Sequence, residues 1–240
     1  MKRIMSILLS AALFFSLAAC DTAQNASEDA AASQSVDSTP QTNSAETTKS
    51  PQSNTEKSED STMDSSATSK ILVAYFSLAG EQYNVGVVEE GNTSIIAHMI
   101  ADQTEADMFE ITPVTPYPTT YSGLLEVSQQ EISDNARPEI DGSVDNMANY
   151  DVVFIGYPNW WGDMPRIVYS FLESYDFSNK TVIPFCTHGG SGLSGTEKTI
   201  ANICKGATMQ DGLAVAGTIA QNDRDAAEKA VTDWLAKITY

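Results

Sequence analysis

Two adjacent tryptophans, Trp160 and Trp161, lie in the segment from Tyr157 to Gly162, directly after an apolar run. Neighbouring side chains diverge in any backbone conformation, so both indoles cannot face the core. At least one is expected to face a pocket, where an aromatic face stacks on a planar conjugated ring with about 0.5–1.5 kcal/mol beyond burial of its area. A single core anchor beside a rim residue is the plainer alternative.

A second group of residues has the chemistry to hold a phosphate. The sequence Gly91-Asn92-Thr93-Ser94 stands where a helix is expected to begin, after a loop that leaves a strand at Ser77. Backbone N–H groups and hydroxyls at a helix start suit a phosphate dianion. Ordinary helix capping is the alternative. The segment has neither the G-K-[ST] ending of a Walker loop nor a G-x-G-x-x-G motif.

A third segment, Thr187 to Gly192, is rich in glycine. Glycines let backbone amides approach a ligand closely, and such amides can donate to the ring nitrogens and carbonyl oxygens of a flavin. A flexible turn is the alternative. His188 in this segment either donates a proton to a substrate or bonds to nearby backbone. None of the three segments contains Lys or Arg, so a phosphate held here would be bound by dipoles and hydroxyls.

Taken together, these segments resemble the flavodoxin-like family in its bacterial branch. The matching residues are Tyr75-Phe76-Ser77 with Gly91-Asn92-Thr93, then Gly156 to Gly162, then Thr187 to Gly192. The resemblance covers nearly all of residues 70–240 and implies FMN as the cofactor. It implies a phosphate site of Ser77, Asn92, Thr93 and Ser94, a ring flanked by Pro158, Asn159, Trp160, Trp161 and Gly162, and contacts to the other ring edge from Thr187, His188, Gly189 and Gly190.

One stretch departs from the family pattern. Compact members pass from the first Ser to G-N-T within a few residues, whereas here Leu78 to Glu90 intervene. This insertion either bulges out of the phosphate loop or folds over the flavin as a lid. Ala79 and Gly80 are therefore expected only as neighbours of the phosphate.

The elements that must position these segments alternate along the chain. Strands are predicted at 71–76, 107–111, 151–156, 181–186 and, most weakly, 212–217; helices are predicted at 92–103, 121–135, 165–172, 195–203 and 224–238. Continuous apolar strands such as ILVAYF are typical of a sheet covered on both faces. The expected fold is a doubly wound α/β domain with a parallel five-stranded sheet, in the flavodoxin-like order 2-1-3-4-5, and ligands bind beyond the carboxyl ends of such strands.

The first 69 residues carry a different signal. Lys2 and Arg3 precede an apolar run that ends in small residues before Cys20, which predicts a secretory signal peptide over 1–19. The four residues ending in Cys20 resemble a lipobox, which implies a lipid-modified cysteine; an ordinary cleaved signal is the alternative. Residues 20–69 are polar and contain no large aliphatic residue except valine and methionine, so we expect a disordered linker that joins the anchor to a domain at 70–240.

Charge and cysteines limit the remaining possibilities. The formal net charge of −19 argues against nucleic acid as a partner, because phosphates would be repelled. Cys186 and Cys204 are expected to be small buried residues, with a disulfide as the alternative. No C-x-x-C or His/Cys cluster is present, so no structural metal is predicted.

These observations lead to three functional hypotheses. The first is an FMN-binding electron carrier, attached to the outer face of the cell membrane through its lipid anchor only, with a redox partner protein or a small-molecule acceptor. The second is an FMN-dependent NAD(P)H oxidoreductase acting on quinone-, nitro- or azo-type acceptors, in which the cofactor supplies the chemistry. The third is a flavin-free binding module, because a fold alone does not fix a function.

Overall fold

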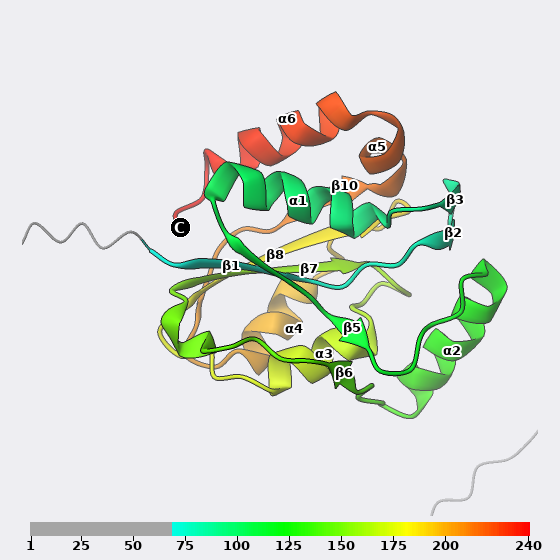
Figure 1. The fold of residues 1–240 in the computed structure, drawn as a ribbon, viewed down its shortest axis with the longest axis horizontal. Helices are drawn as coiled ribbons and strands as arrows, with labels where there is room; N and C mark the ends of the chain where they lie inside the picture. The colour runs from blue at the N-terminus through cyan, green and yellow to red at the C-terminus, as the bar shows by residue number, and fades with distance from the viewer. Residues whose placement is uncertain (1–68) are drawn as a thin grey trace, which may run out of the picture. The chain divides into compact units, whose positions relative to one another are not determined.

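A computed structural model describes residues 69–240, and its centre is a parallel sheet. The strands are β1 (Ile71–Tyr75), β4 (Asp107–Glu110), β7 (Val152–Pro158), β8 (Thr181–His188) and β10 (Leu213–Ala216). They lie side by side in the order β10-β8-β7-β1-β4, with every neighbouring pair parallel (Figure 1). Numbered along the chain this order is 2-1-3-4-5, so the predicted fold class is confirmed. The predicted signal peptide, Cys20 and nearly all of the linker lie outside the described residues.

The central strands β1, β7 and β8 bury side chains on both faces of the sheet. Along β1, Leu72 and Ala74 join one apolar cluster, and Val73 and Tyr75 join the other. This alternation follows from the two-residue period of a strand, and it explains why β1 reads as a continuous apolar run. The two clusters require a helical layer on each face.

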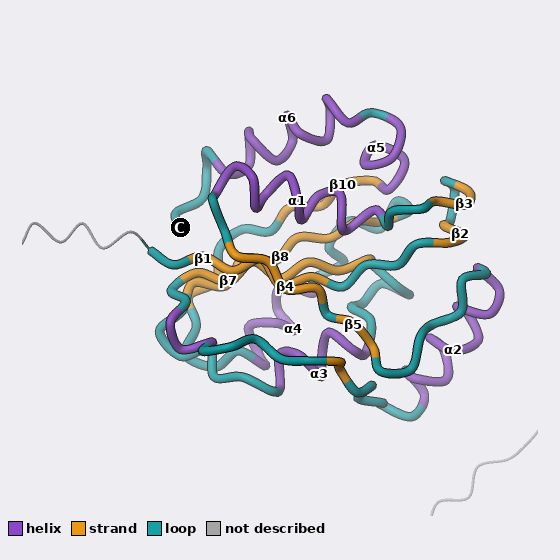
Figure 2. Tube along the Cα trace, in the orientation of Figure 1, coloured by secondary structure: helices purple, strands orange, loops and turns teal. Residues whose placement is uncertain are grey.

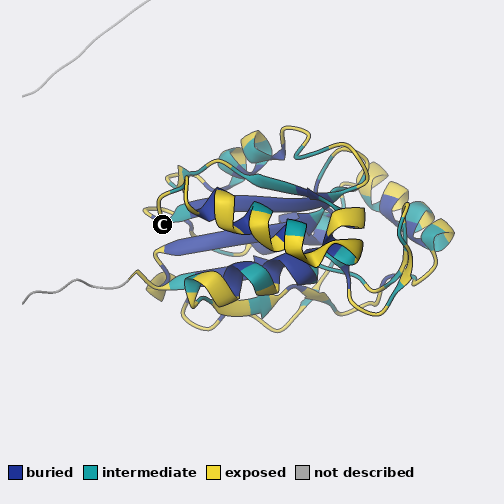
Figure 3. Ribbon diagram, turned by 90° about the horizontal axis from the view of Figure 1, so that it is seen from above, coloured by how far each residue is buried: buried dark blue, intermediate teal, exposed yellow. Residues whose placement is uncertain are grey.

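Five helices supply those layers. Helices α1 (Asn92–Thr104), α5 (Gly217–Asn222) and α6 (Arg224–Leu235) cover one face, while α3 (Arg166–Glu173) and α4 (Thr196–Ile203) cover the other (Figure 1). Their inner sides are buried and their outer sides exposed (Figure 3). Within residues 69–240, no helix has the length and apolar character needed to cross a membrane.

Helix α2 (Tyr121–Ser133) is placed differently from the other helices. It lies beyond the carboxyl ends of the strands and contacts α3 and the strand β2 (Figure 2). Only Leu124 and Ser128 are buried in it, and Ile132 is 36% exposed. The helix was correctly predicted, but its apolar residues face the end of the sheet instead of a sheet face.

Several small elements were not predicted. The insertion contains the hairpin β2 (Gly80–Gln82) and β3 (Gly86–Val88), and two further strands, β5 (Thr112–Pro113) and β6 (Ile140–Asp141), pair near a 3₁₀ turn, η1 (Met147–Asn149). The fifth strand position is divided, because β9 (Thr208–Met209) and β10 both pair with β8. At the break, the carbonyl of Asp211 accepts a hydrogen bond from the Trp234 indole at 2.8 Å.

Candidate functional site

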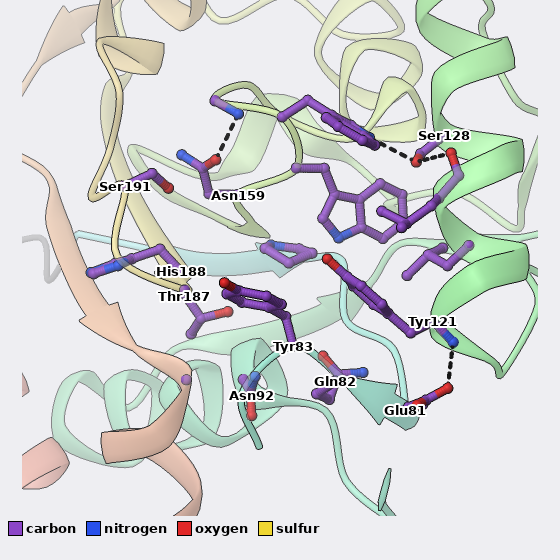
Figure 4. A pocket seen from close by; sticks show the side chains of 18 residues that line it. Glu81, Gln82, Tyr83, Asn92, Tyr121, Ser128, Asn159, Thr187, His188 and Ser191 are labelled. Atoms are coloured by element: carbon purple, nitrogen blue, oxygen red, sulfur yellow. Dashed lines mark hydrogen bonds between the residues drawn. The ribbon is translucent and has the colours of Figure 1, made fainter. Parts of the chain in front are cut away.

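The three chemically unusual segments meet at one cleft of about 350 Å³ at the carboxyl ends of the strands (Figure 4). We call the part formed by Pro158–Gly162 and Thr187–Gly189 the tryptophan end. We call the part formed by Ser77 and the start of α1, residues 92–94, the helix end. The predicted Pro158, Asn159, Trp160, Trp161, Gly162, Thr187, His188, Gly189 and Asn92 all line the cleft.

A tight turn presents the two tryptophans. Trp160 and Asp163 exchange two backbone hydrogen bonds of 2.9 Å, and the residues between them, Trp161 and Gly162, have positive φ angles of 57° and 78°. Two left-handed central residues are the pattern of a type I′ turn. A bulky residue in this conformation is strained by about 1 kcal/mol or more. The hydrogen bond of 3.0 Å from the Trp161 indole to the Ser128 hydroxyl holds it there.

The two indoles have different surroundings. Trp160 is half-buried and meets the rings of Phe76 and Tyr117 edge to face, each at 5.5 Å between centroids. Trp161 is 52% exposed. Both line the cleft, so the divergence expected from their adjacency is present, with one indole anchored in the core and the other on the rim.

Asn159 connects the two loops of the tryptophan end. Its Oδ1 accepts the N–H of Gly162 at 3.0 Å, and its Nδ2 donates to the carbonyl of Gly192 at 2.8 Å and to the Ser194 hydroxyl at 3.1 Å. Its backbone N–H donates to the carbonyl of Thr187 at 2.8 Å. One side chain therefore fixes the spacing between the tryptophan turn and the glycine-rich loop.

His188 is ordered by its own loop. Its Nδ1 accepts the backbone N–H of Gly190 at 2.9 Å, which leaves Nε2 to carry the proton of the neutral ring. Partial burial lowers the pKa of His188 below its ordinary value of 6.5. The ring is thus neutral near pH 7 and lines the cleft. Gly190, which was predicted to contact the ring edge, serves this hydrogen bond and does not line the cleft.

At the helix end, most of the predicted hydroxyls bond to other protein groups. Ser77 Oγ accepts the N–H of Ser94 at 3.0 Å, and Thr93, which is buried, shares a 2.8 Å hydrogen bond with the Thr187 hydroxyl. The Ser94 hydroxyl donates to the Glu90 carboxylate at 3.1 Å. These three side chains are absent from the lining of the cleft, so the structure brings them to the helix end without turning them toward a ligand.

Asn92 is the exception at the helix end. It lines the cleft, and its Oδ1 is buried without a hydrogen-bond partner in the described part of the chain. A buried polar atom without a partner is costly and is a sign of a missing ligand group. A half-turn of the amide exchanges its oxygen and nitrogen, so this side chain can meet either a donor or an acceptor.

Comparison with known proteins places this geometry in a family. The model of the flavodoxin family matches residues 70–238. This chain belongs to the flavodoxin family. A candidate flavoprotein from Bacteroides eggerthii is 33% identical over 71% of this chain and 98% of that one, with a TM-score of 0.57. One from Bacteroides uniformis is 31% identical over 68% and 98%, with a TM-score of 0.56.

A further solved structure, a flavoprotein from Lactobacillus acidophilus in complex with FMN, is 18% identical over 70% of this chain and 99% of that one, with a TM-score of 0.51. At this identity it supports the fold alone. Among curated proteins, no significant match is found. Family membership supports the predicted cofactor, FMN, and the unpaired amide of Asn92 beside the start of α1 fits a ligand with phosphate and hydroxyl groups.

Within this flavodoxin domain, a glycine stands directly before α1, and Asn92, the first residue of the helix, lines the cleft. Gly91 precedes the helix and has no side chain to cap it, and the only first-turn N–H that bonds to a side chain in the described part of the chain is that of Ser94, to Ser77 Oγ. A Cβ at Gly91 would collide with the Ser77 side chain and the carbonyl of Leu78, so the loop can pack this closely only against glycine. Ala79 and Gly80 do not line the cleft, and Gly80 packs against Thr119 instead.

Part of the cleft was missed in the sequence. The hairpin contributes Glu81, Gln82 and Tyr83, α2 contributes Tyr121, Leu124, Leu125 and Ser128, and Ser191 and Gly217 complete the lining. The length of the insertion was the only available signal for the hairpin. Nothing in the spacing of the apolar residues of α2 indicated that this helix would form a wall of the cleft.

Tyr117, which contacts Trp160, belongs to a partly buried polar pair with Glu131. The Tyr117 hydroxyl donates to the Glu131 carboxylate at 3.0 Å, and burial raises the pKa of both groups. Arg166 lies 3.7 Å from Asp163 and over the ring of Tyr169. Arg166 therefore contacts a carboxylate and does not line the cleft.

The two cysteines of the domain are separate thiols. Cys186 and Cys204 are both buried and free, as the preferred sequence interpretation expected. Burial raises the pKa of each to about 12, so neither is a thiolate near neutral pH. They pack in the apolar cluster of one sheet face, and neither lines the cleft.

Proposed function

We propose that this flavodoxin-family protein binds FMN in the cleft and transfers electrons. The observation that carries the proposal is that a single cleft joins Asn92, the first residue of α1, to a pair of tryptophans. The helix end offers backbone N–H groups to the phosphate, and the tryptophan end offers aromatic faces to the ring. FMN, when bound, supplies the group that accepts and releases electrons.

The charges of the cleft support a particular mode of binding. Its described lining contains no Lys or Arg, and Glu81 contributes a carboxylate. The phosphate would therefore be balanced by the dipole of α1 and by Asn92, without an ion pair. We expect the affinity for FMN to depend only weakly on salt, because no exposed ion pair is screened.

The absorption spectrum of the purified domain tests the cofactor. The two Bacteroides proteins are almost fully covered by the matched region, which supports expression of residues 70–240 as an independent unit. We expect yellow protein with one FMN per chain, released on unfolding. Colourless protein that leaves the fluorescence of added FMN unchanged contradicts the proposal and favours the flavin-free binding module.

A second candidate is an FMN-dependent oxidoreductase that takes electrons from NAD(P)H and reduces quinone-, nitro- or azo-type acceptors. The neutral His188, with Nε2 available as a donor at the cleft, favours it. Steady-state oxidation of NAD(P)H with such an acceptor distinguishes the two. We expect turnover to fall in His188→Ala if the histidine donates a proton; absence of turnover in the wild type leaves the electron carrier.

We further propose that the protein is held at the outer face of the cell membrane by a lipid on Cys20, with the polar residues 20–69 as linker. The sequence before Cys20 supports this location. Fractionation of cells that express the full chain tests it. We expect wild-type protein in the membrane fraction and Cys20→Ser protein outside it; equal partition of the two variants contradicts the anchor.

A further inference from the structure

Tyr83 is an aromatic residue of the cleft that lies in the inserted hairpin. It occupies the turn between β2 and β3, lines the cleft, and is 56% exposed (Figure 4). Its ring lies directly against the backbone of Gly189, because a Cβ built on that glycine would stand 2.6 Å from Tyr83 Cδ1. The hairpin therefore brings a phenol ring to the glycine-rich loop, whose only ring is the imidazole of His188.

The position of Tyr83 is fixed by contacts on its other side. Its ring stacks on Tyr121 of α2, with centroids 5.8 Å apart and planes 29° apart. The Glu81 carboxylate accepts the backbone N–H of Tyr121 at 2.8 Å, and the N–H of Glu81 donates to the carbonyl of Thr119 at 2.8 Å. These bonds join the hairpin to the start of α2, so the stacked pair forms one wall.

The insertion is also held on the side of α5, through its turn and its last residue. The carbonyl of Glu90, where the insertion ends, accepts a 2.7 Å hydrogen bond from the Gln221 amide, and Val85 packs near Gly217. The insertion is thus attached at α2 and at α5. Its turn presents Tyr83 to the cleft while Val87, in β3, is 83% exposed.

We propose that Tyr83 is a ligand-binding residue, and that its phenol ring packs against the planar ring of the cofactor on the side of the glycine-rich loop. This inference rests on the proposed binding of FMN in the cleft. The glycine-rich loop supplies backbone amides, and the insertion supplies the aromatic contact that glycines cannot make. Residues 78–90 are then part of the binding site.

Binding of FMN and of riboflavin, which has the same ring without the phosphate, tests this role. We expect Tyr83→Ala to weaken both ligands about tenfold, since stacking on an aromatic side chain contributes about 1–3 kcal/mol by alanine substitution for a nucleic-acid base. Tyr83→Phe keeps the ring and should bind within about twofold of the wild type. Val87→Ser, on the same hairpin and exposed, is the control and should bind as the wild type does.

A double-mutant cycle with Gly189→Ala gives a second readout. Gly189 does not have a left-handed φ, so alanine suits its backbone, but the new methyl group displaces the Tyr83 ring. We expect Gly189→Ala to weaken riboflavin binding in the wild type and to add little in the Tyr83→Ala background. Equal losses in the two backgrounds would show that the glycine acts without Tyr83, which contradicts the proposal.

The outcomes separate this inference from the proposed function. Wild-type protein that binds neither flavin overturns both. Wild-type binding that is unchanged or strengthened in Tyr83→Ala overturns only the role of Tyr83, because the ring is then a bystander or an obstacle. A flavin fluorescence that is quenched on binding to wild type and Tyr83→Phe, and less quenched on Tyr83→Ala, supports direct contact.

Discussion

At the tryptophan end of the cleft, aromatic side chains line the ligand space, and Asn159, which also lines it, holds the two loops together. At the helix end, three of four predicted side chains are bonded to other protein groups, and backbone N–H groups with Asn92 remain. The difference teaches that residue types identify a binding loop, whereas the direction of each side chain depends on its neighbours in the fold. The predictions below test this contrast.

The largest effect is expected at Trp160, which belongs to both the core and the cleft. Trp160→Ala removes its contacts with Phe76 and Tyr117 and should lower the free energy of unfolding by about 3 kcal/mol. Trp161→Gly is the matched control, because glycine accepts the positive φ and the Trp161 side chain is half exposed. Denaturant titration should show a change within about 1 kcal/mol for it; a comparable loss for both variants contradicts the distinction.

A smaller effect on the free energy of unfolding is expected when the hydrogen bonds of Asn159 between the two loops are removed. Asn159→Ala removes the side-chain bonds to Gly162, Gly192 and Ser194, and should cost about 2 kcal/mol in unfolding free energy together with weaker riboflavin binding. Asn159→Asp keeps the acceptor for Gly162 and should fall between wild type and alanine. If Asn159→Ala binds riboflavin as tightly as wild type, the loop spacing does not matter for the ring.

At the helix end, we expect a substitution of Asn92 to change the affinity for FMN but not the affinity for riboflavin. Asn92→Asp puts a carboxylate at the cleft beside the start of α1, and should weaken FMN about tenfold through like-charge repulsion, or roughly 1.4 kcal/mol. Riboflavin, which lacks the phosphate, should bind about as before. Isothermal titration with both ligands checks this, and equal losses for the two would place the phosphate elsewhere.

The smallest effect is a pH dependence at His188. The folded pKa is lowered from 6.5, so neutral His188 stabilises the folded state fully above pH 6.5, and this contribution is lost as the pH falls through the folded pKa. Protonation also removes the acceptor for the N–H of Gly190. We expect protonation of His188 to lower the free energy of unfolding by at most about 1 kcal/mol. Unfolding measured from pH 7.5 to 5 should show the wild type approaching His188→Ala on acidification; a constant difference contradicts this.

The fold was predictable because each strand repeats its apolar pattern over several residues. Helix α2 was found in the sequence, but its placement depends on a partner surface, and Leu124 alone does not reveal which surface it meets. The fifth strand was predicted incompletely, because β9 spans only two residues and its pairing with β8 is a contact between residues remote in sequence. Such contacts are long-range and leave no local pattern.

For the site, the three loops were predictable because their residue types are unusual and their strands end at one edge. The directions of Ser77, Thr93 and Ser94 were not predictable, since each depends on an acceptor or donor brought from another loop. Tyr83 and Tyr121 were not predicted to line the cleft, because a single tyrosine in a polar segment does not by itself indicate a binding site. Their pairing exists only once the hairpin and α2 are folded.

Helix α2 has few buried residues, so substitutions in it are expected to change the cleft more than the stability of the domain. With Leu124 and Ser128 as its buried residues, α2 tolerates most substitutions without loss to the sheet and its packed layers. The same helix borders the cleft through Tyr121 and Leu125, which lie outside that buried pair. Natural variants and engineered libraries confined to these positions can therefore alter which molecules reach the cleft while the rest of the domain keeps its sequence.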